Sequence, residues 1–481
     1  MSTDSSIVTT NTLQQHTDAG AAAWPRRAQT AVEHPYLFMT PSEWGMSLFA
    51  AFVAATVSYP LYVDLSPWLG VSAALGTLLL MNAAFATRYC LPFPQIAAMI
   101  GILQLNYAAW LAHYFPIHHY AYDIGNNLQE YLQYSGPAVL CVTAGLLLPV
   151  MALHQSALAR VQTRTQVKSG DVGKELDYLF YAGIGIKILS PAVPGSLQFV
   201  VVLVEQLAYI GVFGRLILGL RGWEKRAAVI FILQFGASLQ SGTFHMLLLW
   251  GAYFVLALAY HRRWGRKTLA VMIAGILGVV VLQQVKTAYR VDRRVHWTPT
   301  ALGQAELFAD NTVDIVLNPS QLWSDKTLAE TARRLNQGWI VNCVIQRVPE
   351  DLPPSRGRML WDQFMATLLP RVLAPGKYRA GGHEYFEKYT GHKLYGASMG
   401  MGYAGEMYAN FGYWGGLRGV FCYGLALGIG FYFLYKMSLR SPLWWAWGAY
   451  IAIVAVKAED TVGFVMNWTV KAAVIAFAVL W

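Results

Sequence analysis

The chain has 481 residues, of which 56% are hydrophobic and 13% are charged, and its mean hydropathy is +0.37. This composition excludes an ordinary soluble protein, because soluble domains carry about 25% charged residues. The net charge of +10 fits basic loops on the cytoplasmic side of a membrane, so it does not indicate nucleic-acid binding. Of the four cysteines, only Cys343 falls in the longest polar segment, so neither a disulfide framework nor a CxxC metal site is expected.

Residues 1–42 are polar and contain no apolar core of a signal peptide, so we expect a cytoplasmic N-terminal tail. Continuous apolar segments follow, each of about 20 residues and long enough to cross a hydrocarbon core of about 30 Å. Because these segments do not alternate polar and apolar residues, they predict an all-α polytopic membrane protein with about twelve transmembrane helices, and not a β-barrel. The predicted spans are 43–62, 68–86, 91–114, 136–154, 177–191, 196–219, 226–242, 244–260, 268–286, 411–435, 443–457 and 462–481.

The short basic loops predict the orientation, because Lys and Arg are enriched on the cytoplasmic side. Basic residues at 88, 160–174, 221–226, 262–267 and 436–440 all fall on one side of the predicted membrane. That side is predicted to be the cytoplasm, together with both termini. Transmembrane helices 1–9 then occupy residues 43–286, one large extracytoplasmic (periplasmic) loop occupies residues 287–410, and helices 10–12 occupy residues 411–481.

The large loop is expected to contain short helices. Apolar residues at helical spacing, including Leu328, Leu335 and Trp339, predict a helix over residues 326–348, which Pro349 ends. A second short helix is predicted over residues 359–369. The frequent glycines over residues 381–402 favour a mobile loop.

Basic residues mark this loop and its border with the membrane. Lys286 and Arg290 share one helical face where a predicted span leaves the bilayer, and Arg334, Arg371 and Lys377 follow in the loop. Arginine stays charged and can bind phosphate oxygens through two parallel hydrogen bonds. Cations beside a membrane fit an anionic, lipid-linked substrate, although Lys286 and Arg290 fit equally well as anchors to lipid head groups.

A transfer reaction onto a hydroxyl group needs a general base, which is usually a carboxylate or a histidine. The candidates in the loop are His383, Glu384, His392 and Glu406, although Glu406 also fits a structural role beside the next span. His383, Glu384 and Glu387 resemble a zinc-binding helix motif but lack its second histidine, so no metal is expected.

Several motifs of the loop occur in a defined order. They are Arg334-Leu-Asn-Gln, Val344-Ile345, Pro349, Gly357, Pro370-Arg371, Pro375-Gly-Lys377 and Gly405-Glu-Met-Tyr-Ala-Asn-Phe-Gly412. Together with Lys286 and Tyr289-Arg290 upstream, they resemble the Wzy-like O-antigen and exopolysaccharide repeat-unit polymerases. The resemblance covers the loop and its flanking helices, and it departs from the family pattern at His245, where an arginine would be expected.

This resemblance implies a metal-independent, inverting-type glycosyltransferase of the bacterial inner membrane that uses no cofactor. Its donor and acceptor would be glycans linked to undecaprenyl pyrophosphate, in contact with membrane lipid, and a chain-length regulator would be a plausible protein partner. The catalytic residues would be Arg334, Arg371, Glu406, His383 and Glu384. The substrate-binding residues would be Lys286, Arg290, Lys377 and Asn410.

Two other functions remain open at this stage. An O-antigen ligase shares the architecture, but its usual histidine-led loop motif is not found at His383 or His392. A flippase or other transporter of lipid-linked oligosaccharides is expected to show internal symmetry, which this sequence lacks. Within the spans, Lys187, Glu205 and Lys471 are costly in hydrocarbon, so we expect Glu205 either to pair with one of these lysines or to line a groove for the polyprenyl carrier.

Overall fold

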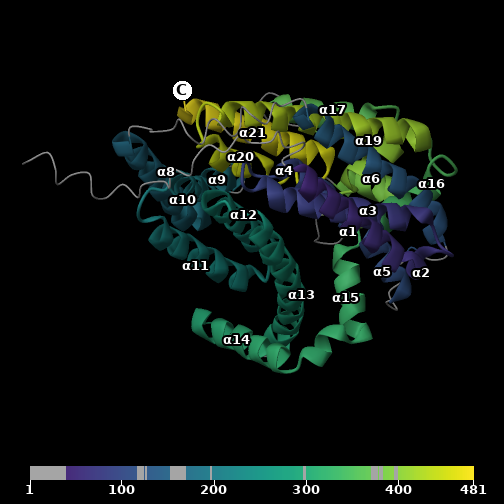
Figure 1. Cartoon of the computed structure of the whole chain (residues 1–481), viewed down its shortest axis with the longest axis horizontal. Helices are drawn as coiled ribbons and strands as arrows, with labels where there is room; N and C mark the ends of the chain where they lie inside the picture. Colours follow the sequence, from purple (N-terminus) through teal and green to yellow (C-terminus); the bar gives the residue numbers. More distant parts are fainter. Residues whose placement is uncertain are drawn as a thin grey trace, which may run out of the picture.

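The computed structural model describes residues 39–115, 124, 127–151, 169–194, 198–295, 300–369, 378, 383–394 and 399–480. These residues form a predominantly helical structure (Figure 1). Within these described ranges, seven helical segments are long and apolar enough to cross a membrane: Pro67–Ala86, Phe93–Tyr114, Leu128–Met151, Gln198–Ile217, Arg266–Arg293, Gly402–Ser438 and Val462–Leu480. The chain is therefore a helical, multi-pass membrane protein, while the count of twelve spans stays a prediction.

The helices follow the predicted apolar segments in chain order. The first half contains α1 (Pro41–Val57), α2 (Tyr59–Tyr62), α3 (Pro67–Ala86), α4 (Phe93–Gly101), a π-helix (Ile102–Tyr107), α5 (Ala108–Tyr114), α6 (Leu128–Met151), α8 (Ser169–Leu189), α9 (Gln198–Glu205), α10 (Leu207–Ile217), α11 (Trp223–Ser241), α12 (His245–Arg262) and α13 (Arg266–Val295). The second half contains α14 (Ala301–Leu317), α15 (Asp325–Leu335), α16 (Gly338–Arg347), α17 (Arg358–Leu368), α18 (His383–Thr390), α19 (Gly402–Ser438), α20 (Trp444–Ala452) and α21 (Val462–Leu480).

The predicted loop 287–410 differs from its expected local structure in three places. The prediction of a single helix over residues 326–348 was wrong, because Asn336 adopts an extended conformation and ends α15. The Asn336 Oδ1 then accepts a hydrogen bond from Trp339 N at 3.3 Å, in the first turn of α16. Helix α14, capped by Thr300, was not anticipated. Helix α18 forms where the glycines favoured a mobile loop. The predicted helix over residues 359–369 is confirmed as α17.

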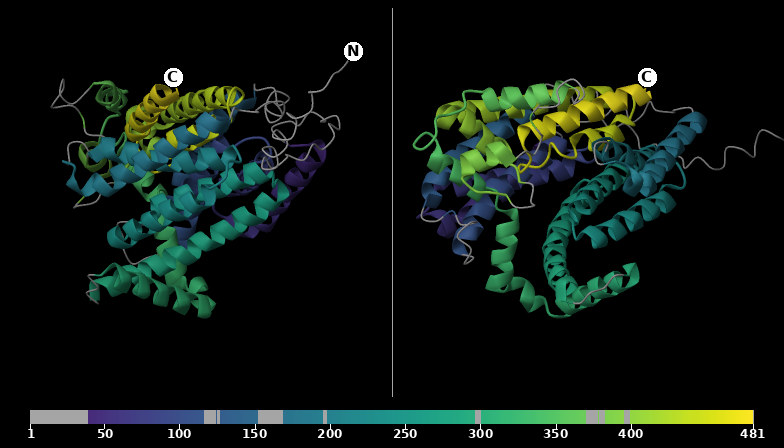
Figure 2. Two further views of the ribbon diagram at one scale, coloured as in Figure 1. Left: turned by 90° about the vertical axis from the view of Figure 1, so that its left-hand side faces the viewer. Right: turned by 180° about the vertical axis from the view of Figure 1, so that it is seen from behind.

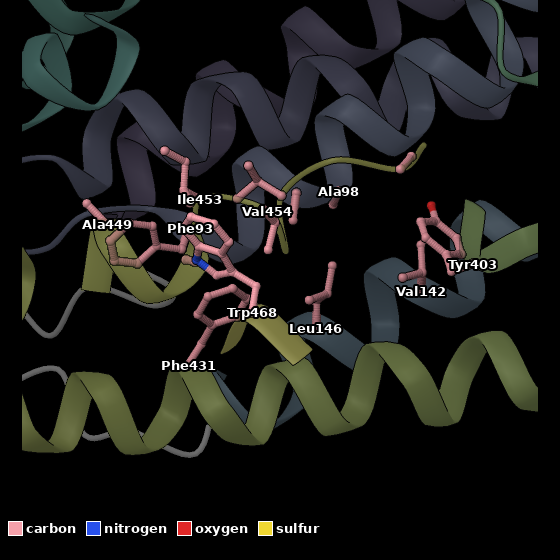
Figure 3. Close-up of a cluster of buried hydrophobic side chains, with 14 of the residues drawn as sticks. Phe93, Ala98, Val142, Leu146, Tyr403, Phe431, Ala449, Ile453, Val454 and Trp468 are labelled. Carbon is pink, nitrogen blue, oxygen red and sulfur yellow. The ribbon is translucent and has the colours of Figure 1, made fainter. Parts of the chain in front are cut away.

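The main body is built on a close contact between α6 and α19. A Cβ atom on Gly424 would lie 2.6 Å from the Val142 carbonyl oxygen, and one on Gly428 would lie 2.5 Å from the Gly145 carbonyl oxygen. These glycines let the two backbones touch, which is how helices pack tightly inside a membrane. Beside this contact, apolar side chains of α4, α19, α20 and α21 fill the core, with Phe93 stacked on Phe431 at 5.9 Å (Figure 3).

A second group of helices extends from the main body. Figures 1 and 2 show α14 at the edge of the molecule, with α13 leading out to it and α15 leading back. Helices α11, α13 and α14 share a small apolar core of their own around Leu239, Tyr289 and Phe308. Helix α15 then contacts α5, so residues of the predicted outer loop return to the main body.

Several of the predicted cytoplasmic basic loops meet at one end of the structure. Thr87 and Thr268 share a hydrogen bond at 2.9 Å, which places the loop containing Arg88 beside the start of α13. Tyr260 at the end of α12 lies 6.0 Å from Trp445 at the start of α20, ring centroid to ring centroid. This grouping agrees with the predicted topology, and the compartment that this end faces stays a prediction.

The charged residues inside the apolar helices are partnered. Lys187 Nζ lies 3.9 Å from Glu205 Oε2 and donates to Gln234 Oε1 at 3.0 Å. The expected pairing of Glu205 with a lysine is confirmed for Lys187. Lys471 instead lies over the Phe199 ring, with its Nζ 4.8 Å from the ring centroid.

Candidate functional site

The site is organised around a non-helical segment between α20 and α21, residues 453–461, which we call the α20–α21 loop. Helix α20 ends at Ala452, earlier than the predicted limit of 457, and the chain resumes as α21 at Val462. Much of the loop is buried, so its backbone groups need partners inside the protein. Ala458 N donates to Gln104 Oε1 at 3.1 Å, and Val462 N at the start of α21 donates to Glu406 Oε2 at 2.9 Å.

Gln104 holds this loop from a π-helical turn. Such turns are rare, and those that exist are frequently found at functional sites. The Gln104 carbonyl oxygen accepts from Gln337 N at 3.1 Å. Its side-chain Nε2 donates to Glu459 Oε2 at 3.1 Å, and Gln337 Nε2 approaches the same oxygen at 3.4 Å. The π-helix, the α15–α16 break and the α20–α21 loop therefore meet at Glu459.

Three of the predicted basic residues come together at α13 and α15. Lys286 lies within electrostatic range of both Arg290 and Arg334. The two helices are joined close by, where Gln284 Nε2 on α13 donates to Thr331 Oγ1 on α15 at 2.9 Å. In the sequence, Lys286 and Arg290 lie one helical turn apart and Arg334 is on a separate segment; the fold brings the two segments together.

Two further basic side chains extend this group towards the α20–α21 loop. His245, at the start of α12, lies within electrostatic range of Lys457, Glu459 and Lys286. We call His245, Lys286, Arg290, Arg334 and Lys457 the basic cluster. Glu459 lies at its border, and the excess of positive charge makes the cluster a suitable place for an anion.

Three members of the basic cluster, Arg290, Lys457 and Arg334, differ in their local surroundings. Arg290 Nε donates a hydrogen bond to the Gly242 carbonyl oxygen at 2.8 Å. This bond gives that carbonyl group a partner in the short connection between α11 and α12. Lys457 Nζ forms an ion pair with Asp460 Oδ2 at 2.6 Å. Burial raises the pKa of the Asp460 carboxyl above its ordinary value, and the Lys457 ammonium opposes that shift. Arg334 is exposed on α15.

Glu406 and Asn410 lie on α19 and are fully engaged within the protein. Glu406 is 1% exposed, and its Oε1 and Oε2 accept from Gln363 Nε2 and Val462 N, each at 2.9 Å. Asn410 Oδ1 accepts from the Ser355 hydroxyl at 2.5 Å, while its Nδ2 donates to the Glu406 carbonyl oxygen at 2.8 Å. These contacts position α17 and α21 against α19.

The structure therefore groups only some of the predicted site residues. Lys286, Arg290 and Arg334 are together, whereas Glu384 is exposed on α18 and lies within electrostatic range of Tyr378. Arg371, Lys377 and the side chain of His383 lie outside the described residues. Their roles stay predictions.

Sequence reasoning missed Lys457, Glu459 and Gln104. The signal for the first two was the charged run Lys457-Ala-Glu-Asp460 between two apolar segments, which was interpreted only as the end of one span and a short connection. Gln104 lies within an apolar span and carries no comparable signal.

Within the described part of the chain, no three His, Cys, Asp or Glu side chains are grouped in a way that could hold a metal ion. No protein-family model, curated protein or solved structure matches the chain.

Proposed function

We propose that the protein is a membrane glycosyltransferase that polymerises repeat units linked to undecaprenyl pyrophosphate into O-antigen or exopolysaccharide. The basic cluster is the observation that supports this proposal most strongly. It combines Lys286, Arg290 and Arg334 at one end of a long apolar helix, and His245 and Lys457 lie in electrostatic range of Lys286 or of each other. The order of the motifs around these residues adds the resemblance to the Wzy-like polymerases.

The chemistry of polymerisation explains why cations would gather here. A hydroxyl group of the acceptor glycan attacks the anomeric carbon of the donor, and the pyrophosphate leaves with the electron pair of the broken carbon–oxygen bond. Negative charge therefore grows on the leaving group, and cations held in place beforehand stabilise it in the transition state. Arginine suits this role because its guanidinium group stays charged and can bind two phosphate oxygens at once.

The helix that carries Lys286 and Arg290 also suits a lipid-linked donor. The Arg266–Arg293 span is strongly apolar, and only 11% of its apolar stretch is buried within the protein. A polyprenyl chain lying along this exposed apolar surface would bring its pyrophosphate to the end of the helix where Lys286 and Arg290 lie. The same helix would then contact both parts of the substrate.

The direct test is incubation of the purified protein with lipid-linked repeat units, followed by gel analysis of the products. A polymerase produces a ladder of lipid-linked glycans that differ by one repeat unit. A single transfer to a different acceptor, without a ladder, would indicate a ligase. Movement of the repeat unit across a vesicle membrane, with no new glycosidic bond, would indicate a flippase and contradict the proposal.

A further inference from the structure

Glu459 occupies an unusual position for a carboxylate in this protein. It lies on the non-helical α20–α21 loop and is half-buried. Its Oε2 accepts hydrogen bonds from the side-chain amides of Gln104 and Gln337, at 3.1 and 3.4 Å. Its Oε1 has no hydrogen-bond partner among the residues that the structure describes, so one oxygen is held and the other is available.

The orientation of this carboxylate is fixed in advance. Gln104 uses its Nε2 on Glu459, its Oε1 on Ala458 N and its carbonyl oxygen on Gln337 N. The side-chain amide that holds Glu459 is thus itself fixed through its Oε1, and the backbone of Gln104 is fixed through its carbonyl oxygen. A catalytic group needs such support, because its own position must not change during the reaction.

Two neighbouring carboxylates provide a comparison. Asp460 is bound to the Lys457 ammonium at 2.6 Å. Both oxygens of Glu406 accept hydrogen bonds, from Gln363 and Val462, and the residue is 1% exposed. Glu459 instead lies within electrostatic range of His245, and His245 is also within electrostatic range of Lys286. Asp460 is thus neutralised by an ion pair and Glu406 is bound by two hydrogen bonds in the interior, whereas Glu459 borders the basic cluster and, in the described part of the structure, has only neutral amides as hydrogen-bond partners.

We infer that Glu459 is the general base that activates the acceptor hydroxyl. This inference rests on the proposed function. As the acceptor oxygen forms its bond to the anomeric carbon, its proton passes to Glu459 Oε1, and the bond from that carbon to the pyrophosphate oxygen breaks. The leaving pyrophosphate stays with Lys286, Arg290 and Arg334. Gln104 and Gln337 act as positioning residues through their hydrogen bonds to Oε2.

The test compares Glu459→Gln with Glu350→Gln, a change at an exposed carboxylate in the turn after α16. Removing a general base typically lowers the rate by about 10²- to 10⁴-fold. We expect this loss in the kcat of Glu459→Gln and none in Glu350→Gln. Binding of the lipid-linked donor to purified Glu459→Gln should match the wild type, because the basic cluster is intact.

Chemical rescue separates a base from a structural residue. In Glu459→Ala, added formate can enter the vacated space and accept the proton, so turnover should rise with formate concentration. Glu459→Gln fills that space and should not respond.

Wild-type turnover in Glu459→Gln would overturn this inference alone. Equal loss of donor binding and turnover, without formate rescue, would show a structural role and also overturn it. A wild-type protein that forms no polymer would instead overturn the proposed function.

Discussion

The α6–α19 contact and the α20–α21 loop lie in the same main body but are built in opposite ways. At the α6–α19 contact, glycines let two helical backbones touch, with Gly424 against Val142 and Gly428 against Gly145. At the α20–α21 loop the helix is broken, and side chains from other helices satisfy its backbone, as Gln104 does for Ala458. The first region is stabilised by close packing, while the second is stabilised by hydrogen bonds between polar groups.

This difference suggests which changes affect stability and which affect function. Packed backbones tolerate no added volume, because the interior has no space for it. Partly exposed charges contribute little to folding. We therefore expect substitutions in the α6–α19 contact to lower the stability of the protein, and substitution of the exposed Arg334 in the basic cluster to leave it folded but inactive.

The largest effect should follow replacement of Arg334. Removing one preorganised donor from such a site typically lowers the rate by about 10²- to 10³-fold. Arg334→Lys should fail nearly as badly as Arg334→Ala, because an ammonium group cannot form two parallel hydrogen bonds to phosphate. The measurement is polymer laddering at matched expression, with Arg358→Ala, at an exposed position on α17, as the control. Near-normal ladders in Arg334→Lys would show that only diffuse positive charge is needed.

The next effect concerns stability at the α6–α19 contact. Gly424→Leu should destabilise the protein by about 1–3 kcal/mol or more, because the new side chain would overlap the Val142 backbone. Gly430→Leu, at an exposed position on the same helix, is the matched control, since no atom lies within 4 Å of its added Cβ. Thermal unfolding in detergent measures both. Equal melting temperatures for the two variants would contradict the backbone contact.

A smaller loss of stability is expected when the ion pair of Lys187 is broken. Glu205→Gln removes the charge that lies 3.9 Å from Lys187, but Gln234 still accepts from the ammonium at 3.0 Å. The loss should therefore be about 1.5 kcal/mol, at the lower end of the range for one hydrogen bond to a charged group. Unfolding of Glu205→Gln, Lys187→Met and the double variant gives the coupling between them. A coupling of zero would show that the pair does not contribute.

No change is expected on removal of divalent ions. The proposed site uses arginine and lysine where a metal enzyme would use clustered carboxylates. Laddering should therefore survive prolonged treatment with a chelator. Loss of activity that magnesium or manganese restores would contradict a cation-based mechanism.

The sequence was sufficient for the helical class and for part of the site. Continuous apolar segments predict helices, because only helices and closed barrels pair all backbone groups in a bilayer, and barrel strands alternate polar and apolar residues. Lys286 and Arg290 were identified because they are basic residues at a predicted membrane border, and Arg334 because its motif resembles that of the Wzy-like polymerases.

The rest of the site depends on contacts between distant segments. The break at Asn336 depends on a side chain capping the next helix, and the role of Glu459 depends on Gln104, which is 355 positions away in the chain. Hydropathy and helical spacing are properties of neighbouring residues, so they predict neither of these two contacts. For the same reason, the hydrogen bonds of Glu406 and Asn410 inside the protein could be identified only from the structure.

The most direct test of the account is the binding of undecaprenyl pyrophosphate to the purified protein. The wild type should bind this lipid, Arg358→Ala should bind it equally well, and Arg334→Ala should bind it at least about tenfold more weakly, a loss of about 1.4 kcal/mol. Undecaprenol, which has no phosphate, should show no difference between the variants. Equal binding of undecaprenyl pyrophosphate by the wild type and Arg334→Ala would contradict the assignment of the basic cluster as the pyrophosphate site.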